Sequence, residues 1–341
     1  MTIALPAVIG DIGGTNSRFQ LLGPDGEAAD VPVSRLNRDH VSISDALLSA
    51  FGSEVLLGVK SLVIAVACPV QDPPFRLTNA MWVIDPEEIM GRLGFEAVHV
   101  MNDFVAQGLA CVSLDVSQMG QIGGLPRDPS GPRVVVGPGT GLGVAQVLRT
   151  RDSWMIVPGE GSHVDLGPRT DREFALWPHL EMRGCRLEVE MAVSGQGLEN
   201  LYRGLKRLEN RADRDTAATA EEVTRRASEG SDALALEAVA LFTTILARFC
   251  GDLALLTLAR GGVYLAGGMT RHFTGAVSGP AFREAFEDKP PFSALMAEIP
   301  VYVMPKGNPA LDGIAAHVRD WGAFDIDHAV HVTRKNRETA S

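Results

Sequence analysis

The chain twice repeats one local design, an apolar strand that runs into a glycine-rich turn and returns as a second strand. The first copy is AVIGDIGGTNSRFQLL (7–22) and the second is VVVGPGTGLGVAQVL (134–148). Such a turn gives up side-chain packing and backbone entropy, so its bare backbone must approach something closely, and phosphate is the first candidate. Two copies in one chain predict two related α/β halves that present two phosphate loops to one cleft.

The glycine spacing of the second copy excludes two common phosphate-binding motifs. Its glycines are Gly137, Gly139, Gly141 and Gly143, which fit neither the dinucleotide fingerprint nor the P-loop with its following lysine. The segment VAQVL after them is β-prone, so it predicts a strand where those motifs need a helix. A tight hairpin with bulges would explain a single copy equally well, and the repetition is what favours a nucleotide.

Strand and helix patterns alternate over the first hundred residues, and the second half is mainly helical. Strands are predicted around 61–70, 96–101, 262–269 and 299–304, and helices over 43–55, 86–93, 104–112, 172–182, 197–208, 220–227, 233–258 and 309–321. This alternation predicts an open mixed or parallel sheet. The expected domains are a small α/β domain (1–112) completed by a C-terminal helix (309–325), a large α/β domain (113–308) and a flexible tail (326–341).

Bulk properties exclude several classes of protein. The 341 residues carry a formal net charge of -11, which opposes non-specific binding to nucleic acid. No apolar run approaches the roughly eighteen residues needed to cross a bilayer, and the first residues, MTIALPAVIG, lack the features of a secretory signal. Cys68, Cys111, Cys185 and Cys250 form no C-x-x-C pair that would suggest zinc or redox chemistry. We therefore expect a cytoplasmic protein with reduced thiols and no membrane or nucleic-acid partner.

The first glycine turn begins with a carboxylate. Asp11 precedes GGTN, and a carboxylate beside phosphate-binding amides is useful when a cation such as Mg2+ is also present. Thr15, Asn16 and Arg18 add hydrogen-bond donors to the same turn. The alternative is an Asx-turn, in which Asp11 accepts a hydrogen bond from the backbone two residues on.

Asn102 and Asp103 stand where a predicted strand ends and a predicted helix begins, in VMNDFVAQGLA. Ligands of open α/β sheets gather at the carboxyl ends of strands. Asp103 is thus well placed as a general base that takes the proton from a hydroxyl attacking phosphorus. Aspartate is also a preferred helix N-cap, and from this segment alone capping explains Asp103 better than catalysis does.

Three further polar side chains lie in glycine-rich segments. Glu160 and His163 belong to VPGEGSHVDLGP, and Glu190 belongs to LEVEMAVSGQGL. Carboxylates and imidazoles form directional hydrogen bonds with sugar hydroxyls, although each could equally be a solvated surface group. No further Cys or His lies close enough to complete a metal site. In YLAGGM, a buried strand runs into Gly267 and Gly268, either as a packing point or to lay flat backbone against adenine or its ribose.

Taken in order, these segments resemble the bacterial glucokinase family, within the sugar-kinase, heat-shock-protein and actin superfamily. The matching motifs are DIGGTNSR, NDF, GPGTGLGVA, PGEGSHVD, SGQGLENLY, AGGM, and IPVYVM followed by NPALDGIAAH, which span about residues 8–319. The resemblance implies a two-domain α/β protein with the actin-like ATPase (ribonuclease H-like) fold, a duplicated β-sheet core and an interdomain cleft. It also implies phosphorylation of glucose at the 6-hydroxyl, the first step of glycolysis, with ATP and Mg2+, by a homodimer.

The same resemblance implies a role for each motif residue. Those near the transferring phosphoryl group would be Gly13, Gly14, Thr15 and Asn16, with Asp11 toward Mg2+. Those that receive the nucleotide phosphates would be Gly139, Thr140 and Gly141, and those at the adenosine would be Gly267 and Gly268. The glucose contacts would be Asn102, Asp103, Glu160, His163 and Glu190, with Asp103 as the base for the 6-hydroxyl.

Two departures from neighbouring patterns bear on specificity. Ser162 stands where family members commonly have glycine, and its hydroxymethyl group could alter affinity or epimer preference. The neighbouring family of repressors, open-reading-frame proteins and sugar kinases carries a cysteine-rich zinc motif near the corresponding histidine, and nothing like it is present here, so no structural zinc is expected.

Two alternative functions stay open. One is a kinase for another hexose or an amino sugar on the same fold. The other is a sugar sensor that binds without phosphorylating. Sensors of the neighbouring family usually carry a helix-turn-helix segment ahead of the first phosphate motif, where about ten residues stand here. The presence of both Asp11 and Asp103 favours a kinase.

Overall fold

The computed structural model describes residues 2–77, 82–210, 218–272 and 274–335. Unit 1 comprises Met1–Gln118, Ala145–Pro158 and Pro305–Ser341, and unit 2 comprises Met119–Val144 and Gly159–Met304. Residues 145–158 belong to unit 1, whereas the sequence placed them in the large domain. The chain changes units inside β10 (Leu142–Arg149) and β11 (Trp154–Gly159), where no linker composition marks the change.

Unit 1 is built on a six-stranded sheet in the order β15-β7-β4-β1-β2-β3. Its strands are β1 (Ala7–Ile12), β2 (Asn16–Leu22), β3 (Val33–Leu36), β4 (Ser61–Val66), β7 (Ala97–Asn102) and β15 (Val330–Arg334). The shorter strands β5 (Phe75–Arg76) and β6 (Val83–Ile84) pair with each other, and β14 (Phe324–Asp325) pairs with β11. β1, β4 and β7 are parallel neighbours, and β2 returns antiparallel to β1, which confirms the predicted strand, glycine turn and strand.

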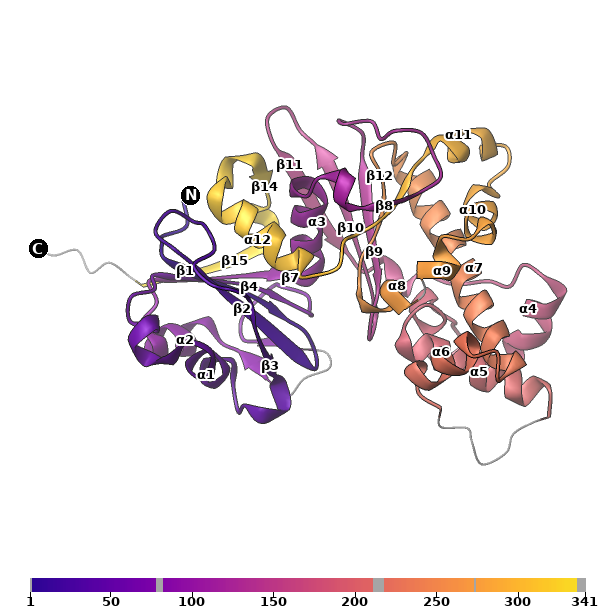
Figure 1. Ribbon diagram of the computed structural model, residues 1–341, viewed down its shortest axis with the longest axis horizontal. Coiled ribbons are helices and arrows are strands. Elements are labelled where there is room, and N and C mark those ends of the chain that lie inside the picture. Colours follow the sequence, from indigo (N-terminus) through magenta and orange to yellow (C-terminus); the bar gives the residue numbers. More distant parts are fainter. Residues whose placement is uncertain (1, 78–81, 211–217, 273, 336–341) are drawn as a thin grey trace, which may run out of the picture. The chain divides into compact units, whose positions relative to one another are not determined.

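Four helices cover the two faces of this sheet. They are α1 (Ile43–Leu56), α2 (Pro86–Leu93), α3 (Asp103–Ser113) and α12 (Pro309–Arg319). Figure 1 shows α1 and α2 on one face and α3 and α12 on the other. Side chains alternate along a strand, so Val8 and Ile12 pack in one buried cluster with Ile43 of α1 and Ile89 of α2.

Helix α2 shows how local chemistry sets the bounds of an element. The Asp85 side chain accepts hydrogen bonds from the N–H groups of Glu87 and Glu88, and Pro86 occupies the first turn. Gly94 ends the helix in the left-handed conformation, with φ of 86°. The helix predicted over 86–93 is confirmed at both ends.

The predicted flexible tail is wrong for residues 330–334. They form strand β15, which pairs antiparallel with β7 from Val330 opposite Met101 to Arg334 opposite Ala97. β15 is an edge strand, and polar side chains are common on edge strands. Its side chains are half-buried except for the exposed Arg334. Residues 336–341 of the predicted tail lie outside the described part of the chain.

Unit 2 has strands in the order β10-β9-β12-β13-β8. They are β8 (Gly120–Ile122), β9 (Arg133–Pro138), the first residues of β10, β12 (Gly262–Leu265) and β13 (Val301–Val303). The helices are α4 (Asp171–Leu176), α5 (Gly195–Leu208), α6 (Ala220–Ser228), α7 (Ala233–Thr257), α8 (Gly268–His272), α9 (Thr274–Val277), α10 (Pro280–Glu287) and α11 (Ser293–Glu298). The second predicted strand, turn and strand is confirmed as β9 and β10.

The helix predicted over 172–182 is shorter in the structure. Helix α4 begins after Thr170, whose side chain accepts a hydrogen bond from the N–H of Glu173, and it ends at Leu176. A 3-10 turn over Trp177–His179 follows. Pro178 lacks an N–H group and its ring clashes with the preceding turn, so an α-helix does not continue through it.

Helix α7 is the core helix of unit 2. Phe242 and Ile245 lie in the buried cluster of this unit, and α7 packs against α5, α6 and α10. Among the described residues, α7 is the one helix long and apolar enough to span a membrane, with a window of mean hydropathy 1.8. More than half of that window, 56%, is buried inside the structure, so its packing in the core explains its apolar sequence.

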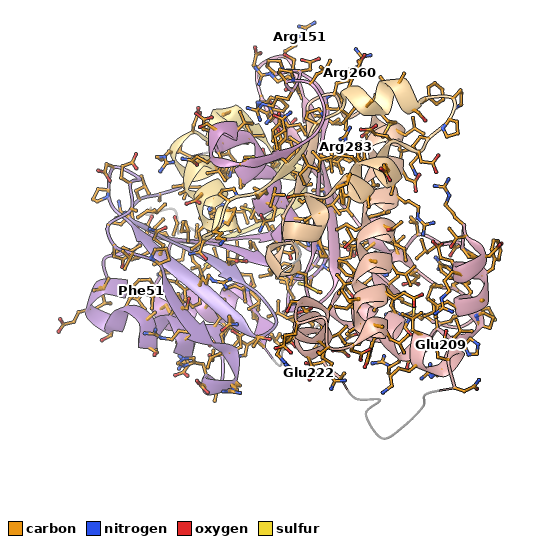
Figure 2. All side chains as sticks on the ribbon, turned by 45° about the vertical axis from the view of Figure 1, so that its right-hand side comes forward. Phe51, Arg151, Glu209, Glu222, Arg260 and Arg283 are labelled. Atoms are coloured by element: carbon orange, nitrogen blue, oxygen red, sulfur yellow. The ribbon has the colours of Figure 1, made fainter. Side chains whose placement is uncertain are left out.

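Arg283 ties the last helices of unit 2 together (Figure 2). Its guanidinium donates to the carbonyl oxygens of Ile299 at 2.9 Å and Met296 at 3.2 Å, and its Nε lies 2.7 Å from Oε1 of Glu287. A single planar group thus satisfies carbonyls at the end of α11.

Two buried histidines lie together in unit 1. His99 on β7 is 2% exposed and His317 on α12 is 1% exposed, and both rings contact Trp321. Burial lowers the pKa of each imidazole to about 4. The charge of Arg334 lowers the pKa of His99 further, and a proton on His99 would lower the pKa of His317 further. Both side chains are therefore neutral in the folded protein at neutral pH.

The free energy of unfolding should fall as the pH drops from 6.5, the ordinary histidine pKa, toward 4. In this window the unfolded chain binds protons that the folded histidines do not, and each histidine costs at most about 1.4 kcal/mol per pH unit. The melting temperature of His317→Phe should therefore decrease less between pH 7 and pH 5 than that of the parent protein. His179→Gln, at a half-buried histidine of unit 2, is the control, and equal losses in all three proteins would contradict the prediction.

Candidate active site

The carboxyl ends of three parallel strands form one edge of the sheet in unit 1. The register places Ile12 of β1 opposite Val66 of β4, and Val66 opposite Asn102 of β7. Neighbouring strands are about 4.8 Å apart, so Ile12 and Asn102 lie about 10 Å from each other along this edge. The structure therefore brings Asp11 and the first glycine turn to the same edge as Asn102 and Asp103.

Asp11 carries a carboxylate that the protein only partly neutralises. Its Oδ2 lies 3.5 Å from Nη1 of Arg18, its cross-strand partner on β2. Burial raises the pKa of Asp11 by more than Arg18 lowers it, although 21% of the side chain is exposed. No Asx-turn forms here, because the N–H of Gly13 donates to the carbonyl of Asn16 at 3.1 Å. The Asp11 carboxylate would gain from a cation.

Asn102 caps helix α3, which leaves Asp103 for another role. Oδ1 of Asn102 accepts a hydrogen bond from the N–H of Phe104 at 2.9 Å, and its Nδ2 donates to the carbonyl of Cys68 at 3.1 Å. The capping explanation of Asp103 is therefore wrong. Asp103 is the first helical residue, where its Oδ1 accepts from the same N–H at 3.1 Å and the helix dipole favours its negative charge.

A neutral thiol lies beside this carboxylate. Cys68 is 5% exposed, and burial, followed by the negative charge of Asp103, raises the pKa of its thiol to about 11. The group next to Asp103 therefore adds no negative charge at neutral pH.

The second glycine turn, in unit 2, is tied to Glu190. The N–H of Gly139 donates to the carbonyl of Gly141 at 2.7 Å, and Oε2 of Glu190 accepts from the N–H of Leu142 at 2.9 Å. A Cβ at Gly141 would lie 2.7 Å from that carboxylate oxygen, so only glycine lets Glu190 come so close. No pattern in the sequence joins Glu190 to the predicted phosphate turn, and the structure places them in contact.

The same turn is held by two other segments. The N–H of Gly195, at the start of α5, donates to the carbonyl of Gly139 at 2.9 Å. Gly267 adopts φ of 83°, and a Cβ there would overlap the carbonyl oxygen of Pro138. A Cβ at Gly268, in contrast, would have no atom within 4 Å. The predicted adenosine segment therefore packs backbone to backbone against the predicted phosphate turn.

Glu188, which sequence reasoning missed, orients His163. Its Oε2 lies 2.7 Å from Nδ1 of His163, while Nε2 of His163 lies 3.7 Å from Oε2 of Glu160. The hydrogen bond from His163, followed by the charges of Arg183 and Arg186, holds the pKa of the Glu188 carboxyl below its usual value. An ionised carboxylate only accepts, so Nδ1 carries the proton and Nε2 faces the exposed Glu160 side. The one signal for Glu188 in the sequence is its place two residues before Glu190.

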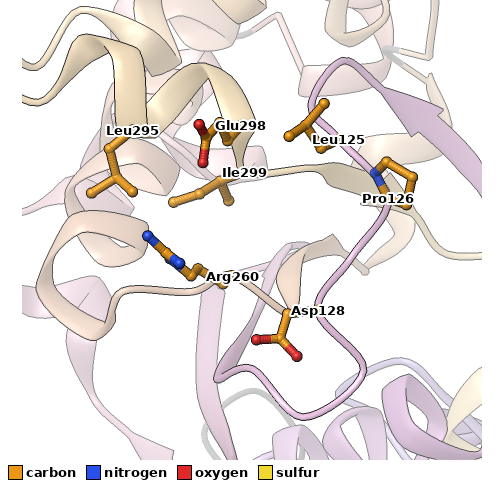
Figure 3. Close-up of a pocket in the computed structure, with 7 residues that line it drawn as sticks. All are labelled: Leu125, Pro126, Asp128, Arg260, Leu295, Glu298 and Ile299. Atoms are coloured by element: carbon orange, nitrogen blue, oxygen red, sulfur yellow. The ribbon is translucent and has the colours of Figure 1, made fainter.

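A separate hollow of about 120 Å³ lies elsewhere in unit 2 (Figure 3). The residues that line it are Leu125, Pro126, Asp128, Arg260, Leu295, Glu298 and Ile299. None of them is a predicted site residue. The Oδ1 atom of Asp128 already accepts a hydrogen bond from the N–H of Ser130 at 2.9 Å. The hollow therefore adds nothing to the site.

Each unit gathers its own predicted residues. Unit 1 holds Asp11, Gly13, Gly14, Thr15, Asn16, Asn102 and Asp103, and unit 2 holds Gly139, Thr140, Gly141, Glu160, His163, Glu190, Gly267 and Gly268. Within the described residues, no group of three or more His, Cys, Asp or Glu side chains could hold a metal ion by itself. A cation here would need ligands from a substrate as well.

Comparisons with known proteins show the family of the chain. A family model described as Glucokinase matches residues 8–321. The glucokinase of Brucella suis biovar 1 (strain 1330) is 43% identical over 322 residues, which cover 94% of this chain and 93% of the relative. A glucokinase structure from an Antarctic psychrotroph has a TM-score of 0.78 and 27% identity, and the match covers 92% of this chain and 98% of that one.

A more distant structure shares the fold. The ROK family glucokinase from Streptomyces griseus, in complex with glucose and AMPPNP, has a TM-score of 0.60 and 18% identity, with 93% of this chain and 99% of that chain covered. The predicted actin-like two-domain α/β fold is thereby confirmed.

Proposed function

The chain belongs to the glucokinase family, and from this premise we propose how its residues carry out the reaction of that family. The protein phosphorylates glucose with ATP at the 6-hydroxyl. The observation that carries this conclusion is the family match over residues 8–321, joined to 43% identity with a relative over nearly the whole chain.

Asp103 acts as the general base. Its carboxylate sits at a strand end, is not needed as the helix cap, and has a neutral thiol for a neighbour. It accepts the proton of the sugar 6-hydroxyl as that oxygen bonds to the γ-phosphorus and the bond to the β-phosphate oxygen breaks. Phosphoryl transfer needs such a base mainly for positioning and late proton removal.

The glycine turns supply N–H groups to the phosphates without side chains in the way. Gly13, Gly14, Thr15 and Asn16 serve the transferring phosphoryl group, whereas Gly139, Thr140 and Gly141 serve the nucleotide phosphates. Gly267 and Gly268 lie against the adenosine. These roles are supported by the tight packing of Gly267 against Pro138, which joins the last two segments.

Asp11 would hold Mg2+. The residues fit such an ion, because Mg2+ is commonly held by one or two carboxylates plus substrate phosphates, and burial disfavours the Asp11 charge in the absence of a cation. Bound there, the ion would neutralise negative charge on the phosphates.

Glu160, His163 and Glu190 bind the sugar, as do Asn102 and Asp103. Replacing Glu160 with glutamine should raise the glucose Kd about 10- to 100-fold, because a hydrogen bond to an ionised acceptor contributes about 1.5–3 kcal/mol. Calorimetric titration with glucose measures this change. Glu221→Gln, at an exposed carboxylate of α6, is the matched control. An unchanged glucose affinity in Glu160→Gln would remove Glu160 from the site.

The direct test of the function is ADP production from glucose, ATP and Mg2+, with each omitted in turn. A kinase for another hexose or amino sugar would show itself in a panel of sugars under ATP. A non-catalytic sensor would bind sugar and release no ADP. Ser162 is 2% exposed in the turn over Gly161–His163, and Ser162→Gly in the same panel tests whether its hydroxymethyl group sets epimer preference.

The setting of the enzyme is also part of the proposal. We infer a cytoplasmic homodimer, as the family resemblance implies. The absence of nucleic-acid and membrane partners is supported by the net charge of -11 and by the burial of α7. Sedimentation of the purified protein tests the dimer.

A further inference from the structure

Asn37 holds the first glycine turn by its carbonyl groups. Its Nδ2 donates to the carbonyl oxygens of Gly13 at 2.7 Å and Gly14 at 3.1 Å. Its backbone N–H donates to the carbonyl of Thr15 at 2.9 Å. Three consecutive carbonyls of the turn therefore face one residue that lies more than twenty positions further along the chain.

Asn37 itself is fixed in place. It is 6% exposed, and its Oδ1 accepts a hydrogen bond at 2.7 Å from Oγ of Ser17, which is fully buried. The Gly13 and Gly14 carbonyls can only accept, so they determine that the amide nitrogen faces the turn and that Oδ1 faces the Ser17 hydroxyl. The Nδ2 atom of Asn37 thus binds the turn, and its Oδ1 atom is bound by Ser17.

Because each peptide group is planar, the hydrogen bonds from Asn37 to the carbonyls also fix the direction of the N–H groups. In a trans peptide, the carbonyl of one residue and the N–H of the next point in opposite directions. With the Gly13 and Gly14 carbonyls facing Asn37, the N–H groups of Gly14 and Thr15 face away from it. Within the described chain, neither of these two N–H groups donates to any protein acceptor.

We propose that Asn37 is a positioning residue for phosphoryl transfer: it turns the carbonyl oxygens of the first glycine turn away from the transferring phosphoryl group and leaves the N–H groups aimed at it. This rests on the proposed function of that turn. Successive N–H groups with one orientation form an anion-binding concavity, whereas carbonyl oxygens at the same place would repel the phosphoryl oxygens. The hydrogen bonds from Asn37 orient these peptide groups before the nucleotide binds.

Replacing Asn37 with alanine should lower kcat about 10- to 100-fold, because a misplacement of about 1 Å at the reacting group costs about that much. The KM for ATP should rise, and the glucose Kd measured by calorimetry should stay within about twofold of the parent, because the sugar contacts are on other segments. Asn37→Asp keeps the size and the bond from Ser17 but cannot donate to the two carbonyls. It should lose at least as much kcat as Asn37→Ala.

A matched control comes from β2, the strand that carries Ser17. Nε2 of Gln20 donates to the carbonyl of Asp30 at 2.9 Å, so Gln20→Ala removes an amide-to-carbonyl bond from β2 away from the turn. It should leave kcat within about twofold of the parent. Amide hydrogen exchange over residues 13–16 gives a readout besides activity: AMPPNP with glucose should slow it in the parent protein and much less in Asn37→Ala.

The outcomes separate this inference from the proposed function. A parent protein that makes no ADP from glucose refutes the function itself. An active parent with an unchanged kcat in Asn37→Ala overturns the role of Asn37 alone. A variant that only melts earlier, with normal kcat per folded molecule and normal slowing of exchange, would also overturn it, because Asn37 would then be merely structural.

Discussion

Replacing Asp103 with asparagine should lower kcat for glucose phosphorylation by about 10²- to 10⁴-fold, the range that a general base contributes. Glucose affinity should fall only a few-fold, because the amide keeps an oxygen that accepts hydrogen bonds. The helix should be intact, since Asn102 supplies the cap. A coupled ADP assay at saturating glucose and ATP, with calorimetry for glucose, measures the two effects.

The matched control for Asp103→Asn is Asp85→Asn. Asp85 also stands at the start of a helix of unit 1, where its carboxylate caps α2, and asparagine caps about as well. This variant should keep its kcat. Near-normal turnover in Asp103→Asn would show that the proton leaves by another route and would remove Asp103 from the role of base.

Replacing Gly267 with alanine should cost about 3 kcal/mol of unfolding free energy and abolish most ATP binding. The left-handed conformation of Gly267, with φ of 83°, and the overlap of a new Cβ with the Pro138 carbonyl act together. The new Cβ would meet a backbone atom and not the end of a flexible side chain. The clash is therefore relieved only if the whole second glycine turn shifts. Urea unfolding and titration with AMPPNP measure the two losses.

The neighbouring glycine provides the control for this prediction. A Cβ at Gly268 meets nothing within 4 Å, so Gly268→Ala should leave the unfolding free energy within about 0.5 kcal/mol of the parent. Weaker AMPPNP binding in Gly268→Ala, without loss of stability, would support contact of this residue with the nucleotide. Equal stability losses in both variants would contradict the packing argument for Gly267.

Much of the fold was predictable where short-range chemistry decides it. Helix α2 follows from Asp85, Pro86 and Gly94, which lie within ten residues of one another. The two strand, turn and strand units follow from runs of apolar residues on either side of glycines. The family followed from the order of the motifs, and the comparisons confirmed it.

The resemblance to a family predicted which residues form the site, whereas the local sequence around each residue did not. Read locally, Asp103 was a better helix cap than a base, and only the structure shows that Asn102 caps α3. The roles of the site residues stay predictions that the proposed variants test. Asn37 belongs to no motif, and Glu188 is marked in the sequence only by its place two residues before Glu190.

The sequence by itself determined most of the helices and the two strand, glycine turn and strand units, because periodicity, caps and turns act over a few residues, and the order of its motifs determined the family. Only the tertiary structure decided that Asn37 grips the first turn, that Glu188 orients His163, and that residues 330–334 complete a sheet. Each of these depends on a hydrogen bond between groups more than twenty residues apart. Such partners are chosen by how the chain packs, which no local pattern records.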